Sequence, residues 1–276
     1  MKEDNDVRRI FLLNPDQRLL REAARTGVQV RSAEADPLDE RALRPVLDEA
    51  AAAGLFVNPA RSLRVLADPE AVRRLVRDNR LSPDATGPPA GGTRLSVETL
   101  SVHGMHQTVG ITARMPYGLL YPAPLTEDTA AEVRAVVTAL LDLTGYQYGP
   151  AHTNVVLTAR GPVITGCRAE LARDPVPELL EVAGGFELAA GAVAVLAGRL
   201  VDTVRPGRYA AAAVLNPPWR LETGEVGVLP HVRHVSPPDS LRPGHLVVHA
   251  DSPEVAAQRV TSLTELVTGN GSGTNR

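Results

Sequence analysis

The first eighty residues alternate between short apolar runs and longer segments whose apolar positions recur every three or four residues. The apolar runs have the length of strands, and they fall at residues 8–13, 28–35 and 55–59. The longer segments predict helices at residues 16–27, 36–54 and, as one helix or two, 62–81. Alternating strands and helices predict a small parallel sheet with helices over its faces.

The pattern changes after residues 82–92, "SPDATGPPAGG", which are rich in proline and glycine. Alternating positions around tight turns then predict two hairpins, at residues 94–115 and 151–171. Helical spacing follows at residues 126–145, at 174–199 around a Gly-Gly break, and at 252–267. Further strands are predicted at residues 209–218, 224–230 and 245–250.

These elements predict an α/β (α+β) protein, with a small parallel domain followed by an antiparallel sheet with packed helices. The predicted domains span residues 1–82 and 83–268, and the polar, Gly-rich residues 269–276 are expected to be a disordered tail.

Composition narrows the class of protein. The 276 residues are 43% hydrophobic, which suffices for a sizeable core, and the net charge of −3 shows no basic field for nucleic acid. A single cysteine excludes an internal disulfide framework. No apolar run reaches the roughly 18 residues of a membrane span, and the N-terminus lacks a signal-like apolar core. We therefore expect a cytoplasmic protein that binds neither membrane nor nucleic acid. Its many Ala, Arg, Pro and Val residues are typical of a GC-rich bacterial genome.

Five motifs occur in an order that resembles the ATP-grasp enzymes, in particular the carboxylate–amine ligases that join L-amino acids. They are "VNPARSLRVLADPEAVRRLV", "GTRLSVETLSVHGMHQTVGIT", "YPAPL", "GPAHTNVVLTARGPVI" and "DPVPELLEVAGGFEL". Together they cover most of residues 8–200, and the resemblance implies a truncated ATP-grasp-like fold.

Two departures from that family bear on function. In the family, a lid sub-domain that binds the nucleotide precedes the second motif, whereas here only "LSPDATGPPAGG" joins the flanking elements. The family's active-site strand reads Glu-x-Asn-x-Arg, and its Glu and Asn hold magnesium. The matching positions here are Gly166, Arg168 and Glu170, and Asn154 stands where the preceding strand has another metal-binding Glu. The resemblance therefore implies a chain without ATP-dependent ligation, cofactor or metal.

Several matching positions still carry polar side chains. Alternation along strands places Asn154, Arg168 and Glu170 on one face with Glu98. We predict a shallow site for an amino-acid-like zwitterion. Its catalytic candidates are Glu98, His152 and Glu170, and its substrate-binding candidates are Arg114, Asn154 and Arg168. The alternative is an ion pair of Arg168 with Glu170 or Glu98 that has only a structural role.

Cysteine and the other histidines add little to this prediction. Cys167 falls on the opposite parity of its strand, which favours a buried apolar role over a nucleophile. His103 and His106 flank a turn and are expected to face solvent, and His231 and His234 are expected in a loop. His245 and His249 would share one face of a strand, but no carboxylate signature accompanies these histidines, so we predict no metal site.

Three interpretations of function remain open. The first is a pseudoenzyme that binds a small amino-acid-like ligand and associates with itself or with a biosynthetic enzyme of amino-acid or peptide metabolism. The second is an ATP-independent lyase, cyclase or isomerase on an amino-acid-like substrate. The third is a residual ATP-dependent carboxylate–amine ligase. The first is preferred because the motif losses remove the metal ligands and the lid.

Overall fold

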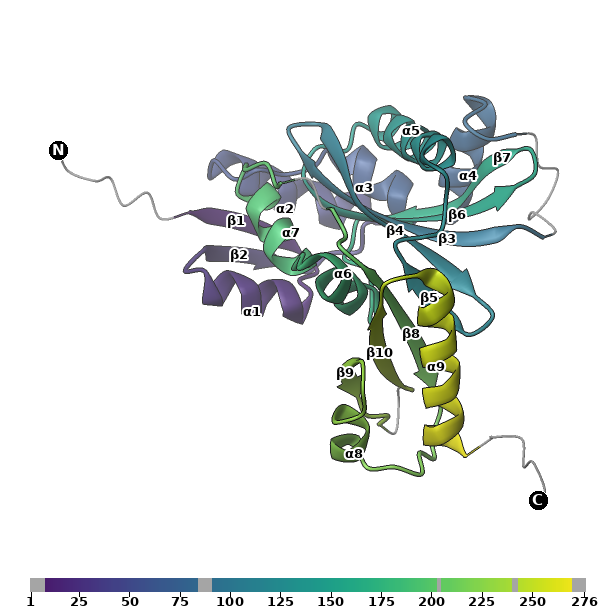
Figure 1. Ribbon diagram of the computed structural model, residues 1–276. Helices are drawn as coiled ribbons and strands as arrows, with labels where there is room; N and C mark the ends of the chain where they lie inside the picture. The colour runs from purple at the N-terminus through teal and green to yellow at the C-terminus, as the bar shows by residue number, and fades with distance from the viewer. Residues whose placement is uncertain (1–7, 84–90, 203–204, 240–242, 270–276) are drawn as a thin grey trace, which may run out of the picture. The chain divides into compact units, whose positions relative to one another are not determined.

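The chain forms two compact units that interleave along the sequence, as described by a computed structural model (Figure 1). The structure describes residues 8–83, 91–202, 205–239 and 243–269. The first unit comprises residues 1–109, 126–172 and 188–203, and the second comprises residues 110–125, 173–187 and 204–276. The domain bounds predicted from element order, 1–82 and 83–268, divide the chain by sequence, whereas these units divide it by compactness in space. The predicted bounds therefore stay predictions. Most of the predicted tail lies outside the described residues.

The first unit opens with the predicted parallel strands and helices. Strands β1 (Arg9–Leu13) and β2 (Gln29–Ala33) pair in parallel, and helix α1 (Gln17–Arg25) connects them. Helix α2 (Glu40–Ala52) follows. Asp16 and Asp39 cap the two helices, because each carboxylate accepts hydrogen bonds from backbone N–H groups of the first turn. The sequence pattern is confirmed for these four elements.

The third predicted strand, residues 55–59, is wrong. This segment has no ladder partner and is held by side chains instead. The Asn58 amide donates to the Tyr148 carbonyl at 2.6 Å, and its oxygen accepts from the backbone N–H groups of Gln147 and Tyr148. Phe56 stacks on the Tyr148 ring with centroids 4.8 Å apart. Side-chain hydrogen bonds to the backbone can hold an apolar segment in place without strand pairing.

The predicted helical segment at residues 62–81 is two helices, α3 (Ala60–Ala67) and α4 (Pro69–Asp78). The break falls at Asp68, which caps α4 by accepting from the Glu70 backbone N–H. Pro69 occupies the first turn of α4, where its missing N–H costs nothing.

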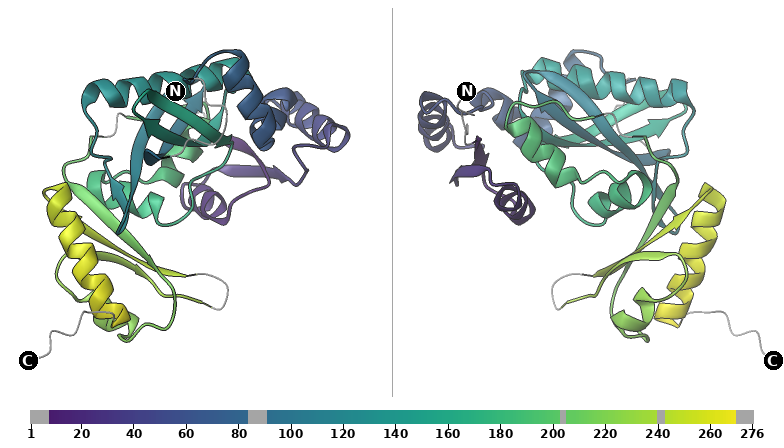
Figure 2. Two further views of the ribbon diagram at one scale, coloured as in Figure 1. Left: turned by 90° about the vertical axis from the view of Figure 1, so that its right-hand side faces the viewer. Right: turned by 60° about the vertical axis from the view of Figure 1, so that its left-hand side comes forward.

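Within the described residues, the larger sheet is antiparallel and has eight strands in the order β7-β6-β3-β4-β5-β8-β10-β9. Both predicted hairpins are confirmed: β3 (Thr93–Val102) with β4 (Met105–Met115), and β6 (Gly149–Thr158) with β7 (Gly161–Arg168). The predicted helix between them is α5 (Glu127–Thr144), as Figure 2 shows from two sides. It ends at Gly145, which adopts the left-handed conformation. The mixed α/β fold class is therefore confirmed.

The predicted helix at residues 174–199 is also two helices, because Gly185 ends the first in the left-handed conformation. They are α6 (Val176–Gly184) and α7 (Leu188–Leu196). Among the described residues, no single helix is long and apolar enough to cross a membrane; α6 and α7 reach that length and composition only when taken together across their bend.

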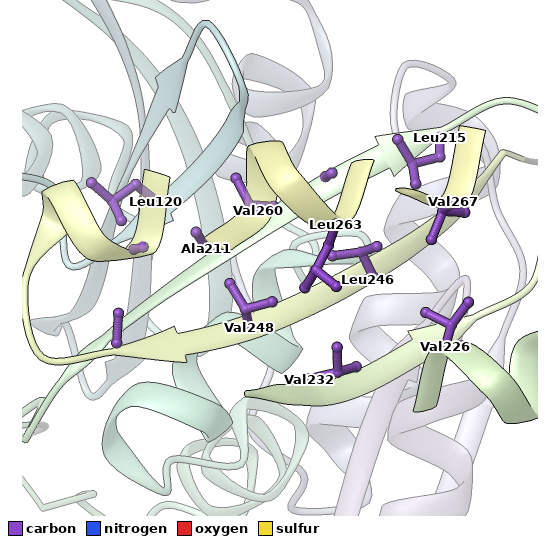
Figure 3. Packing of buried hydrophobic residues seen from close by; sticks show 13 residues of the cluster. Leu120, Ala211, Leu215, Val226, Val232, Leu246, Val248, Val260, Leu263 and Val267 are labelled. Carbon is purple, nitrogen blue, oxygen red and sulfur yellow. The ribbon is translucent and has the colours of Figure 1, made fainter. Parts of the chain in front are cut away.

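The second unit contains β5 (Gly118–Tyr121), β8 (Tyr209–Leu215), β10 (Gly244–Ala250) and α9 (Pro253–Thr268). Helix α9 packs on β8 and β10, and its Val260 and Leu263 lie over Leu246 and Val248 (Figure 3). Val247 is also fully buried, although it alternates with these residues and points to the other face of β10. Helix α6 contacts the same two strands. We therefore place α6 on the face opposite α9.

Two sequence predictions fail near the edge of this sheet. Residues 224–230 were expected to be a strand, but Thr223–Gly227 form the short helix α8. Its capping box explains the difference, because the Glu225 carboxylate accepts from the Glu222 backbone N–H at 2.8 Å. The residues expected as a loop contain strand β9 (Val232–Ser236), which pairs with β10. This strand carries His234, which therefore lies in the sheet beside β10 and not in a loop.

Candidate functional site

Three side chains form a row across neighbouring strands of the first unit. Glu98 on β3 lies opposite His152 on β6, and His152 lies opposite Arg168 on β7. In the adjacent row, Ser96 lies opposite Asn154 and Asn154 opposite Gly166. Because residues directly opposite one another, and residues two apart, share a face, the two rows form one surface. The structure thus brings together five of the positions singled out in the sequence.

The second strand of the hairpin predicted at residues 151–171 differs from the prediction in two respects. Register shifts between Asn154 and Val155, which leaves Thr165 as the extra residue of a bulge on β7. Strand β7 then ends at Arg168, so that Glu170 lies beyond it. Strand alternation therefore does not determine the position of Glu170. Its ion pair with Arg168 holds it beside that residue.

The most buried contact of the site joins Glu98 to His152. The Glu98 carboxylate is 2% exposed, and its Oε1 lies 2.8 Å from Nδ1 of His152. Burial alone would lower the pKa of His152, but the hydrogen bond to Glu98 and the charge of Glu98 outweigh burial and raise the pKa above its ordinary value. Nδ1–H therefore donates to the carboxylate, and the protonated imidazole is favoured.

This contact predicts how stability depends on pH. A histidine whose pKa is raised by folding adds stability that is complete below the unfolded pKa of about 6.5 and is lost as the pH rises through the higher folded pKa. We expect the difference in unfolding free energy between wild type and His152→Gln to be larger at pH 5.5 than at pH 9. Urea denaturation at several pH values measures it. A difference that stays constant or grows with pH would contradict the assigned pKa.

Arg168 and Glu170 form an ion pair at the surface of the same unit. Nε of Arg168 lies 2.7 Å from Oε1 of Glu170, and the two side chains are 52% and 40% exposed. Exposed ion pairs of this kind contribute only about 0–1 kcal/mol to stability. A purely structural role for Arg168 therefore has little energetic support.

The positions beside Arg168 leave open space. A Cβ atom added at Gly166 would meet no other atom within 4 Å, so packing does not demand glycine here. Asn154, directly opposite, is exposed. A small ligand at this point would find an amide and a guanidinium on adjacent strands.

Arg114, the remaining substrate-binding candidate, belongs to the second unit. It lies on β4 opposite Leu119 and is exposed. The predicted roles of Glu98, Arg114, His152, Asn154, Arg168 and Glu170 in binding or catalysis stay predictions.

Cys167 is confirmed as a buried residue on the opposite parity. It is 3% exposed and lies opposite Thr153, whose hydroxyl is 3.2 Å from the sulfur. Burial raises the pKa of the thiol to about 12, so the reactive thiolate is disfavoured at neutral pH.

The histidines at the β3–β4 turn behave differently from one another. His103 is exposed, as predicted, and contacts the Tyr148 hydroxyl at 2.8 Å. His106 was expected to face solvent, but its side chain is 1% exposed. It lies 2.8 Å from the Ser101 hydroxyl and 3.4 Å from Asp142. Although this order resembles a catalytic triad, Ser101 is fully buried, so its oxygen is not positioned to reach a substrate.

A further convergence of polar side chains in the second unit was missed. Glu178 on α6, His234 on β9 and His245 on β10 bring their possible ligand atoms within 4.8 Å of one another. His234 was expected in a loop, so its approach to His245 was not predicted. No regular alternation marks this strand, because the apolar residues of "HVRHVS" lie three positions apart; only its β-branched valines favour a strand.

Comparison with solved structures identifies the fold. It is the fold of the ATP-grasp carboxylate–amine ligases. The chain is similar to the L-amino acid ligase from Bacillus licheniformis, with a TM-score of 0.73 and 16% identity over 94% of this chain and 98% of that one. It is also similar to N5-carboxyaminoimidazole ribonucleotide synthetase from Thermotoga maritima, with a TM-score of 0.72 and 11% identity over 95% and 99% of the two chains.

Glycinamide-RNase-transformylase T from Mycobacterium tuberculosis gives a TM-score of 0.72 and 14% identity, over 94% of this chain and 100% of that one. No family model and no curated protein sequence matches the chain. Identities this low establish the fold, and the function must be argued from the site.

Proposed function

We propose that this chain is an ATP-grasp-fold pseudoenzyme that binds a small amino-acid-like carboxylate and does not catalyse ATP-dependent ligation. In this proposal it acts as a binding protein in amino-acid or peptide-type specialised metabolism. It associates either with other copies of itself or with a biosynthetic enzyme. One observation carries the proposal: a cation, Arg168, lies in register with His152 and Glu98, where the family resemblance implies magnesium ligands.

The donor set of this face does not fit magnesium. Mg²⁺ takes octahedral oxygen ligands, usually with one or two carboxylates. Here Glu98 is bonded to His152, and Glu170 is paired with Arg168. Releasing Glu98 would leave a buried imidazole without its acceptor, and a metal ion at this face would be repelled by the guanidinium. Asn154 supplies an amide oxygen without charge.

The short connection between α4 and β3 supports the same conclusion. Helix α4 ends at Asp78 and strand β3 begins at Thr93. A four-stranded lid needs strands of about five residues each with turns between them, which the connection cannot supply. Residues 84–90 within it lie outside the described part of the chain.

The ligand class follows from the same residues. A guanidinium binds a carboxylate through two parallel hydrogen bonds, and Arg168 is half exposed with open space at Gly166 beside it. The Asn154 amide lies on the adjacent strand. Glu170 competes for Arg168 only through a surface ion pair, which an incoming carboxylate can replace at little cost.

Ligand-observed NMR can measure the binding of a panel of L-amino acids and dipeptides, and this measurement tests the proposal. We expect at least one member to bind, and Arg168→Met to weaken its binding tenfold or more, because a charge-assisted contact contributes about 1.5–3 kcal/mol. The melting temperature should change little, since the pair is exposed.

Arg94→Met is the matched control. Arg94 is exposed on β3, four residues from Glu98, or about 13 Å along the strand. It should leave binding unchanged within twofold. If no member of the panel binds at millimolar concentration, or if both variants weaken binding equally, the proposed ligand site is wrong.

A further inference from the structure

A group of metal-ligand side chains converges in the second unit, at the edge of the sheet. His234 on β9 lies opposite Val247 of β10, and His245 lies two residues before Val247 on the same face. The two imidazoles stack nearly parallel, with centroids 5.2 Å apart and an interplanar angle of 13°. Glu178 of α6 approaches the same place, and one ligand atom from each of the three lies within 4.8 Å of the others.

The surroundings of His245 provide independent evidence that a ligand binds here. The residue is 5% exposed, and its Nε2 is buried without a hydrogen-bond partner within the described part of the chain. A buried nitrogen of this kind normally has a partner, because an unmet hydrogen bond costs about 1–3 kcal/mol.

We propose that Glu178, His234 and His245 bind a divalent transition-metal ion, and we assign Zn²⁺ as the ion that fits best. Two imidazoles and one carboxylate match the ligands that zinc takes in proteins, and three protein ligands leave a fourth position for water. Magnesium and calcium prefer sites built from oxygen alone, so two nitrogen ligands disfavour them. A tetrahedral site needs ligand atoms about 3.4 Å apart, so the proposal requires the three side chains, whose ligand atoms now lie within 4.8 Å of one another, to move closer when the ion binds.

The position of the site predicts what the metal does. Glu178 stands in the first turn of α6, and the histidines stand on the last two strands of the sheet. A bound ion would therefore join α6 to the edge strand β9. The predicted role is to fasten that edge. This inference uses side chains of the second unit only, so it stands apart from the proposed binding function.

Titration of untagged protein with Zn²⁺ and Co²⁺ tests the assignment. We expect one equivalent to bind, with the visible absorption of four-coordinate cobalt and without a thiolate-to-cobalt band, because Cys167 is buried and is not one of the three proposed ligands. Zinc at a hundredfold excess over its dissociation constant should raise the melting temperature by about 5 °C. His234→Gln and Glu178→Gln should each weaken binding tenfold or more.

His231→Gln is the matched control. His231 and His249 form a second histidine pair, which meets edge to face with centroids 5.6 Å apart and an interplanar angle of 60°, and Arg208 contacts His249 there. This variant should bind zinc as the wild type does. The assignment is overturned if wild-type protein binds less than one equivalent at micromolar zinc. It is also overturned if His231→Gln weakens binding as much as His234→Gln, which would indicate unspecific binding by surface histidines.

Discussion

Replacing Glu98 by alanine is expected to lower the free energy of unfolding by about 3–5 kcal/mol, because it breaks a buried charged pair and leaves a cavity. Glu98 is 2% exposed and is bonded to His152, whose side chain is 13% exposed. Removing the carboxylate would leave the imidazole N–H without an acceptor. Urea denaturation followed by circular dichroism measures the change.

Two variants separate the causes of this loss. Glu98→Gln keeps the shape and an oxygen acceptor, so it should cost less than half as much. Glu127→Ala removes a carboxylate that is 84% exposed and paired with Arg134, and it should change stability by less than about 0.5 kcal/mol. A loss below 1 kcal/mol for Glu98→Ala would contradict the buried pair.

The second large effect is expected at Leu246 in the core of the second unit. The side chain is fully buried between β8 and α9 (Figure 3), so Leu246→Ala should lower the unfolding free energy by about 2–5 kcal/mol. Trp219, the only tryptophan, packs against the same cluster, and its fluorescence therefore reports the unfolding of this unit.

Val214→Ala is the control for this core. Val214 lies on the adjacent strand β8 and is 50% exposed, so its truncation should cost less than about 1 kcal/mol. If both variants cost the same, Leu246 does not occupy the core position described.

Periodicity was sufficient for elements whose apolar face is buried in regular secondary structure. Helix α5 was predicted within one residue at each end, because Thr126 and Gly145 mark its caps. The hairpins were found from their alternation and their turns. Periodicity gave a wrong prediction where side-chain hydrogen bonds, and not strand pairing, hold a segment. The apolar run around Phe56 is held by the Asn58 amide, and no local pattern reports a partner ninety residues away.

The candidate site was only partly predictable for related reasons. Strand alternation and the family resemblance predicted that Glu98, Asn154 and Arg168 share a face, and the register agrees with this placement. The position of His152 between Glu98 and Arg168 was not predicted. The end of β7 at Arg168 and the bulge beside it were not foreseen, since a single extra residue leaves no mark on composition. The convergence of Glu178 with His234 depends on helix α6 and an edge strand distant in sequence, which only the fold reveals.

We propose above all that the sheet face with Glu98, His152 and Arg168 does not support ATP-dependent chemistry. Isothermal titration calorimetry of the wild-type chain with ATP and Mg²⁺ tests it most directly. Because Glu98 and Glu170 are both engaged and Arg168 stands beside them, we predict no saturable heat at protein concentrations of tens of micromolar. A saturable isotherm with a micromolar dissociation constant, lost on Glu98→Gln, would contradict the claim.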